Sequence, residues 1–314
     1  MSTLTNCNKS FSSFFKYLLI FIVTITVFFA IPKSSDIAYA DMGPKPSVHI
    51  TFKNMGDEPC YGTLLSNYQS TGPHGAWNGE SECERIPDDF TREIWLAFVE
   101  YEDADGYYFL QNGWKCSETK KIHWGYYPPY NFKILLYYPD SDTFVVSGIY
   151  ERYAFNSYYT VNMDGIDIHT VETTETLTAK RSYHYVREAL ALILRIVVTI
   201  LIEIGVALLF RFKDKKVLKV IIATNIVTQI LLNVALNIIR FYEGALTFII
   251  FYFILEFFVF LIEAIVYKVA FNRVSPTKVS GWKSLIYAFI ANVLSFGAGF
   301  LIAILETMLQ YKQF

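Results

Sequence analysis

From Ile221 to Ile239 the chain reads IIATNIVTQILLNVALNII, an apolar run that carries regularly spaced amide side chains. About 20 apolar residues in a helix, at 1.5 Å rise per residue, cross the roughly 30 Å hydrocarbon layer of a bilayer. The amides of Asn225, Gln229, Asn233 and Asn237 recur every fourth residue, a step that advances about 40° on a helix of 3.6 residues per turn. The run therefore predicts a membrane helix with one gently winding polar stripe.

Four such runs fill the C-terminal part of the chain. We predict membrane spans at about residues 188–210, 217–239, 245–270 and 284–305. Residues 181–314 are therefore expected to form an all-α four-helix transmembrane bundle in the lipid bilayer of the cell membrane.

Positive charge is concentrated in two of the three loops between these spans. The first loop and its edge hold Arg211, Lys213, Lys215, Lys216 and Lys219, and the third loop holds Arg273, Lys278 and Lys283. Cytoplasmic loops are enriched in Lys and Arg. We therefore predict that both loops are cytoplasmic, and that the N-terminal domain and the C-terminus are extracytoplasmic.

Polar and ionisable side chains lie within all four runs, where they cost free energy unless they meet partners, water or a function. Glu256 and Glu263 are seven residues apart, and so lie nearly on one helix face. We expect a candidate intramembrane polar site in the bundle interior, formed by Arg195, Glu203, Asn225, Gln229, Asn233, Glu256, Glu263, Asn292, Ser295 and Glu306.

Charge balance within this site leaves two interpretations open. Arg195 and Glu306 are predicted to neutralise each other, whereas the other three acids have no cation at matching depth, so we expect some of them to be protonated. The polar groups either join the helices structurally, at about 0.6 kcal/mol per interhelical hydrogen bond, or line a cavity that binds a cation or relays protons.

Residues 1–40 have the composition of an export signal. Lys9 and Lys16 accompany the apolar segment 17–31, and Ala38-Tyr39-Ala40 offers small residues at the positions that a signal peptidase reads. We predict cleavage after Ala40, with an uncleaved anchor as the alternative.

Residues 41–180 predict a single extracytoplasmic domain that is mainly antiparallel β. Segments such as 48–52, 107–111, 132–138 and 153–162 are rich in the aromatic and β-branched residues that strands prefer. One amphipathic helix is expected to start at residues 87–89 and to end near residue 101. The predicted fold class is therefore mixed, a β-sandwich-like α+β domain followed by the helical bundle.

Cys60, Cys83 and Cys116 lie in this domain. A disulfide is permitted outside the cytoplasm, and three thiols allow one bridge whose pairing the sequence leaves open. The cysteines lack a zinc spacing, and the acidic segment 102–106 lacks the later Glu of an EF-hand loop, so we predict neither a metal nor a cofactor.

The motifs of the common hydrolases are absent from the spans, and all five histidines precede the first span. We therefore predict a non-enzymatic protein, and the net charge of −2 without a basic patch argues against a nucleic-acid partner. The leading hypothesis is an envelope protein whose exported domain binds or senses an extracellular ligand or a partner membrane protein. The alternative is a small proton- or cation-coupled transporter or channel subunit that uses Glu203, Glu256 and Glu263.

Both ends of the predicted mature chain resemble one family of bacterial membrane proteins. The similar stretches are ADMGPKPS at residues 40–47, NIVTQILLN at 225–233, Glu256, EAIVY at 263–267 and ANVLSF at 291–296. The resemblance implies a signal peptide, an exported domain and four spans, and it implies no activity.

Overall fold

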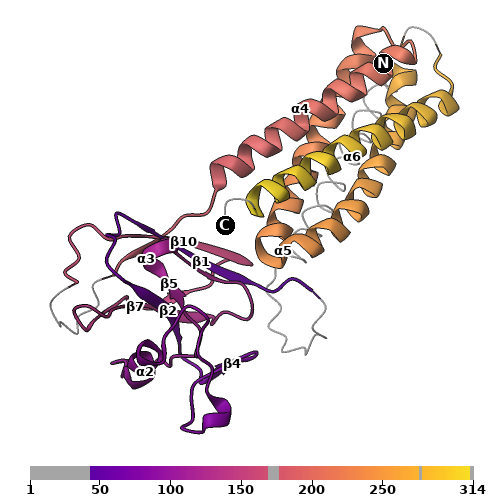
Figure 1. The fold of residues 1–314 in the computed structure, drawn as a ribbon. Helices are drawn as coiled ribbons and strands as arrows, with labels where there is room; N and C mark the ends of the chain where they lie inside the picture. The colour runs from indigo at the N-terminus through magenta and orange to yellow at the C-terminus, as the bar shows by residue number, and fades with distance from the viewer. Residues whose placement is uncertain (1–42, 169–176, 276–277, 312–314) are drawn as a thin grey trace. The chain divides into compact units, whose positions relative to one another are not determined.

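The computed structural model describes residues 43–168, 177–275 and 278–311, the last six of these by their backbone only. The predicted export signal at residues 1–40 lies outside the described residues. The chain divides into two compact units, an N-terminal unit that ends at Tyr183 and a C-terminal unit that begins its helices after His184 (Figure 1).

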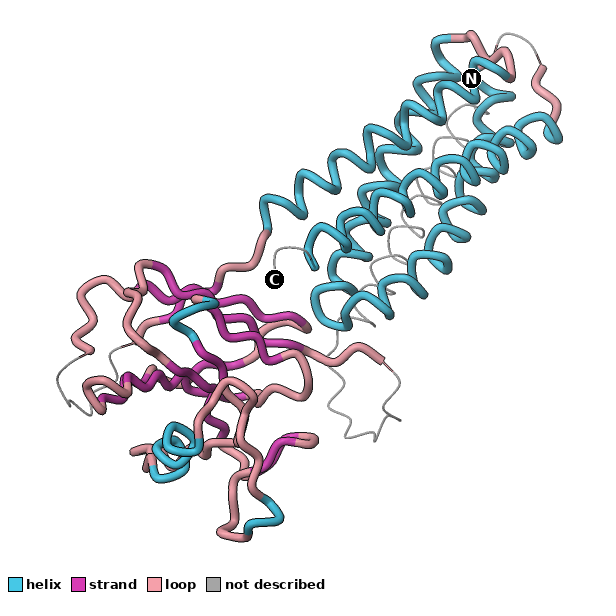
Figure 2. The backbone as a smooth tube through the Cα atoms, viewed as in Figure 1, coloured by secondary structure: helices cyan, strands magenta, loops and turns pink. Residues whose placement is uncertain are grey.

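Two main sheets form the N-terminal unit, whose strands are magenta in Figure 2. The first sheet has the order β11-β10-β1-β6, with β11 at Ala179–Arg181, β10 at Asn156–Asn162, β1 at Ser47–Lys53 and β6 at Lys121–Trp124. The second sheet has the order β5-β2-β7-β8, with β5 at Trp114–Lys115, β2 at Tyr61–Ser66, β7 at Asn131–Tyr138 and β8 at Thr143–Val146. A fifth strand of this sheet, β9 at Tyr150–Glu151, pairs with β7. A short hairpin joins β3 (Ser70–Thr71) to β4 (His74–Gly75).

Antiparallel pairing dominates, because β1 and β10 form the one parallel pair of the described strands. The prediction of an antiparallel-rich β domain that precedes long apolar helices is confirmed. The parallel pair brings the first and tenth strands together, which no local pattern in the sequence predicts.

The hydrophobic core of this unit lies between the two sheets. Its centre is formed by fully buried apolar side chains from both sheets. They are Val48 and Ile50 of β1, Leu64 of β2, and Ile134 and Leu136 of β7. Their alternate spacing along β1 and β7 follows from the two-residue period of a strand.

The outer face of the second sheet is covered by the helix α2, Arg92–Glu100. Trp95 and Phe98 of α2 pack against Leu65 of β2 and Leu135 of β7. Both faces of β2 and β7 are therefore covered, which explains why nearly every residue of these two strands is buried.

Two sequence-based boundaries in this unit were wrong. The helix begins at Arg92 rather than at residues 87–89, because Thr91 caps it by accepting from the Ile94 N–H at 3.3 Å. The predicted strand at residues 107–111 is reduced to one bridge between Tyr108 and Ser66, since the rest of that segment pairs with no strand.

The acidic segment 102–106 forms a turn around a buried ion pair. Asp103 Oδ1 lies 3.1 Å from Lys133 Nζ, and both side chains are 1% exposed. Burial lowers the pKa of Lys133, but hydrogen bonds with Asp105 and Asp103 outweigh this effect and raise the pKa. Asp103 thus neutralises a lysine that β7 would otherwise bury without a counter-charge.

All three cysteines of this unit are free thiols, so the predicted disulfide is not formed in the structure. Cys60 precedes β2 and Cys116 follows β5, and the Ser117 N–H donates to the Cys60 carbonyl at 3.1 Å. Cys60 and Cys116 are both fully buried in the core, whereas Cys83 is half-buried in the 3-10 helix η1, Ser81–Cys83.

We predict that the folded protein reacts with a maleimide at pH 8 faster at Cys83 than at Cys60 or Cys116. Burial raises the pKa of Cys60 to about 12 and that of Cys116 well above its ordinary value. The reactive thiolate is therefore scarce at both buried sites. Peptide mapping by mass spectrometry before and after denaturation measures this order, and labelling of Cys60 at the rate of Cys83 would contradict it.

Three long helices form the C-terminal unit, α4 at Tyr185–Leu209, α5 at Lys215–Val274 and α6 at Gly281–Tyr311. Each of them is long and apolar enough, within the described residues, to cross a membrane. The chain is therefore a multi-pass membrane protein, as the sequence predicts. Figure 1 shows the three helices packed lengthwise against one another.

The helix α5 contains both the second and the third predicted span and reverses direction between them. Asn225 Nδ2 lies 2.9 Å from the Tyr267 hydroxyl, whereas a straight helix would separate these residues by about 63 Å. The reversal occurs at Gly244, with φ 82° and ψ −174°, a region that is essentially restricted to glycine. The sequence predicts a loop around Arg240 and Glu243. In the structure this segment is helical on both sides of Gly244, and Gly244 alone departs from helical geometry.

Candidate functional site

The buried side of α4 carries three polar residues at four-residue spacing, Arg195, Thr199 and Glu203. Several apolar residues elsewhere on α4, such as Leu190, Leu194 and Leu201, are exposed, as suits a helix that meets lipid. The polar stripe therefore faces the other helices, and Glu203 is fully buried there.

Glu263 binds two side chains from two other helical segments. One carboxyl oxygen accepts from Thr228 Oγ1 at 2.7 Å, and the other accepts from Asn292 Nδ2 at 2.7 Å. Thr228 lies on the first arm of α5, Glu263 on its second arm and Asn292 on α6. One carboxyl group thus connects three segments of the bundle.

Glu203 adds α4 to the same network. The Tyr287 hydroxyl of α6 donates to Glu203 Oε2 at 2.8 Å. The Asn225 side chain and the Glu263 carboxyl are both close enough to interact with Glu203. Asn225 also donates to the Tyr267 hydroxyl, which is close enough to interact with Glu263.

We call this network the acid cluster, and it consists of Glu203, Asn225, Thr228, Glu263, Tyr267, Tyr287 and Asn292. All seven side chains are buried. The hydroxyl and amide groups that contact the two carboxyl groups are neutral, so they cannot balance two negative charges.

Two oxygen atoms in the acid cluster, Glu203 Oε1 and Asn225 Oδ1, are buried and accept no hydrogen bond from any residue that the structure describes. The orientation of the Asn225 amide is fixed, because its nitrogen donates to the Ile221 carbonyl at 3.1 Å. An acceptor buried without a donor costs roughly 1–3 kcal/mol. One proton or one small cation held between these neighbouring side chains would satisfy both oxygens.

The remaining predicted site residues lie outside the acid cluster. Gln229 and Asn233 are buried but bond to each other, with Asn233 Nδ2 at 2.8 Å from the Gln229 carbonyl oxygen. Ser295 Oγ donates to the Asn292 carbonyl at 3.2 Å, which keeps its hydrogen bond within α6. The side chain of Glu306 lies outside the described residues, so its predicted pairing with Arg195 stays a prediction.

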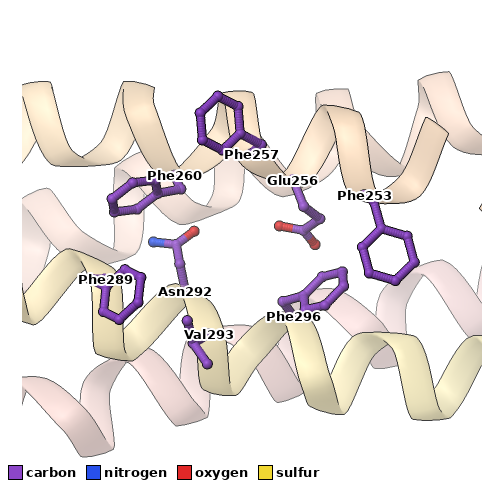
Figure 3. A pocket seen from close by; sticks show the side chains of 8 residues that line it. All are labelled: Phe253, Glu256, Phe257, Phe260, Phe289, Asn292, Val293 and Phe296. Carbon is purple, nitrogen blue, oxygen red and sulfur yellow. The ribbon is translucent and has the colours of Figure 1, made fainter. Parts of the chain in front are cut away.

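Glu256 stands apart from the acid cluster, in a pocket between α5 and α6 (Figure 3). Its carboxyl group interacts with Tyr252 and, electrostatically, with Glu263. The predicted alignment of Glu256 and Glu263 on one helix face is consistent with this interaction, although the two carboxyl groups have different neighbours.

Two tyrosines that sequence reasoning did not select are central to the acid cluster. Tyr267 follows Glu263 by four residues, and so its place on the same helix face was available as a signal. Tyr287 has no such signal, because its contact with Glu203 depends on how α6 packs against α4.

Comparisons with protein-family models, with curated proteins and with solved structures found no match to this chain. No group of three or more His, Cys, Asp or Glu side chains that could hold a metal ion occurs among the described residues.

We predict that Thr228→Val lowers the free energy of unfolding by about 0.6 kcal/mol, and by no more than about 1.7 kcal/mol, because it removes one interhelical hydrogen bond. Thr228→Ser is the matched control, since it keeps the hydroxyl that donates to Glu263. Detergent unfolding of the purified protein measures both variants. Equal stability of the valine and serine variants would show that this hydrogen bond does not join the helices.

Proposed function

We propose that the chain is a small proton- or cation-coupled membrane protein, a transporter or channel subunit whose ion site is the acid cluster. The observation that carries this proposal is the pair of orphaned oxygens, Glu203 Oε1 and Asn225 Oδ1, beside a second carboxyl group. Two neighbouring carboxylates surrounded by neutral donors cannot both stay charged in a low-dielectric interior. A proton or a small cation must therefore share this space.

The two carboxyl groups differ in a way that suggests which of them binds the ion. Both oxygens of Glu263 accept a hydrogen bond, so its geometry suits a carboxylate. Glu203 has one bonded and one orphaned oxygen. We assign the exchangeable proton to Glu203 Oε1, from where it would donate to Asn225 Oδ1.

The membrane topology that accompanies this function is part of the proposal. Each arm of α5 would cross the membrane once, on either side of Gly244, which with α4 and α6 gives four crossings. The Lys- and Arg-rich segments at residues 211–219 and 273–283 would lie in the cytoplasm. The β domain and the C-terminus would then lie on the outer side, after removal of an N-terminal signal.

We predict that reconstituted wild-type protein conducts protons or sodium ions down an imposed gradient, and that Glu203→Gln lowers this flux at least tenfold. The introduced glutamine keeps the size of the side chain and can still accept from Tyr287, but it holds no exchangeable proton. A pH-sensitive dye inside the liposomes, with a potassium diffusion potential, reports the proton flux.

The matched control for this flux is Glu243→Gln, because Glu243 is exposed at the reversal of α5 and outside the acid cluster. Gel filtration of each variant checks that the protein stays folded and monodisperse. Liposomes that stay silent to both ions with the wild-type protein would refute the proposed function.

A second candidate function, ligand sensing by the β domain, is favoured by a pocket beside the last strand of that domain. This β11 pocket has a volume of about 410 Å³ and is lined by Asn131, Ile149, Tyr150, Glu151, Tyr159, Ala179 and Arg181. Arg181 Nη2 lies 3.3 Å from Glu151 Oε1, so the pocket offers charges of both signs. Only Ser182, Tyr183 and His184 separate β11 from α4.

We predict that a small polar ligand of the β11 pocket stabilises the wild-type protein but not Arg181→Gln. A thermal-shift screen of amino acids, dipeptides and monosaccharides would measure this difference. Lys180→Gln is the control on the same strand, since Lys180 is exposed and does not line the pocket. A panel in which every stabilising compound acts equally on Arg181→Gln would exclude this pocket as the sensing site.

A further inference from the structure

We propose that the pocket around Glu256 binds a lipophilic organic cation of the quaternary-ammonium class. We call it the phenylalanine pocket, and it is lined by Phe253, Glu256, Phe257, Phe260, Phe289, Asn292, Val293 and Phe296. The assignment of this cation as the substrate class of the bundle rests on the proposed cation-coupled function. The binding step itself is tested without that function.

The phenylalanine pocket combines a nearly complete aromatic wall with one acid. Its volume is about 200 Å³, and it lies between the second arm of α5 and α6. Figure 3 shows the Glu256 carboxyl group and the Asn292 amide pointing into the space between the two helices, with phenyl rings on both sides. Glu256 is 9% exposed, so it is nearly removed from the surroundings of the bundle.

The mouth of the pocket is on the outer surface of the bundle. Phe253, Phe257, Phe289 and Val293 are each more than half exposed. These residues lie well inside the apolar helices, where the surroundings of a membrane protein are lipid tails. A ligand that enters here must therefore dissolve in the bilayer.

Charge complementarity selects a cation. A carboxyl group in hydrocarbon is stabilised by a positive partner, and a cation within about 6 Å of a phenyl ring is attracted by the negative face of the ring. A quaternary ammonium group has no N–H donors, so it loses little by leaving water for a wall of phenyl rings. A primary alkylammonium ion, with its three N–H donors, or a metal ion keeps a tighter hydration shell and does not suit so apolar a wall.

The phenylalanine pocket is connected to the acid cluster through Asn292. The Asn292 amide lines the pocket and donates to Glu263 Oε2 at 2.7 Å. The Glu256 and Glu263 carboxyl groups also interact electrostatically. A cation beside Glu256 would therefore offset the negative charge of Glu263, which would weaken its repulsion of a second carboxylate and favour release of the proton from Glu203.

Tyr252, one turn before Glu256 on α5, packs closely against α6 at Gly299. A Cβ atom at Gly299 would lie 2.6 Å from the Tyr252 hydroxyl, so glycine permits Tyr252 to approach α6 closely. Tyr252 interacts in turn with Glu256.

Equilibrium dialysis of the detergent-solubilised full-length protein tests the proposal, with benzyltrimethylammonium as the probe. Its neutral carbon isostere, neopentylbenzene, has the same shape, and empty micelles correct for partition of both compounds. We expect saturable binding of benzyltrimethylammonium but not of neopentylbenzene. The affinity for the cation should be at least tenfold weaker in Glu256→Gln. Phe257→Leu should weaken binding several-fold, whereas Phe258→Leu, which changes a neighbouring ring outside the pocket, should not.

Three results would overturn the proposal. They are equal binding of the cation to wild type and Glu256→Gln, equally tight saturable binding of the neutral isostere, and equal weakening of binding by Phe257→Leu and Phe258→Leu. Dialysis at constant pH requires no ion gradient. Binding without flux of either ion would therefore disprove only the proposed function, and flux without binding would disprove only this pocket.

Discussion

A carboxyl group in the hydrocarbon region of a bilayer needs hydrogen-bond partners from the protein, and for Glu263 and Glu203 these partners lie on other helical segments. Water cannot solvate Glu263 there, so its two oxygens accept from Thr228 and Asn292 at 2.7 Å each. Tyr287 extends the same requirement to Glu203 on α4. Apolar side chains pack almost as well against lipid as against one another, whereas these polar contacts exist in only one arrangement of the helices.

The reversal of α5 makes that arrangement reachable. Thr228 and Glu263 belong to one continuous helical element and meet only because Gly244 adopts a conformation that other residues avoid. The residues on both sides of Gly244 are helical, so no flexible loop separates the two arms. A short, stiff connection of this kind fixes which residues of the two arms lie at the same level.

The N-terminal unit differs from the helical unit, because its core is apolar and its buried lysine is paired with an acid. Val48, Leu64 and Ile134 fill the space between the sheets, and α2 covers the remaining apolar face of the second sheet. The one buried lysine among the described residues of this unit, Lys133, is neutralised by Asp103. The N-terminal unit and the acid cluster differ in how they compensate buried charge. The β domain gives its buried charge an opposite charge, whereas the acid cluster gives two acids only neutral donors.

The sequence by itself determined the membrane helices, most strand positions and the polar stripe of Asn225, Gln229 and Asn233. These features follow from hydropathy and from periods of two or 3.6 residues, which act over neighbouring residues. It also identified Glu203, Glu263 and Asn292 as buried candidates, because an acid or amide within a long apolar run must face inward.

Only the tertiary structure decided how these side chains divide among separate sites. It joined Asn225 to the acid cluster but left Gln229 and Asn233 bonded to each other, and it placed Glu256 in an aromatic pocket of its own. The helix period gives the direction of a side chain but not the rotation of one helix against the next. Contacts such as Tyr287 with Glu203, or β1 beside β10, join residues far apart in the chain, and no local pattern encodes them.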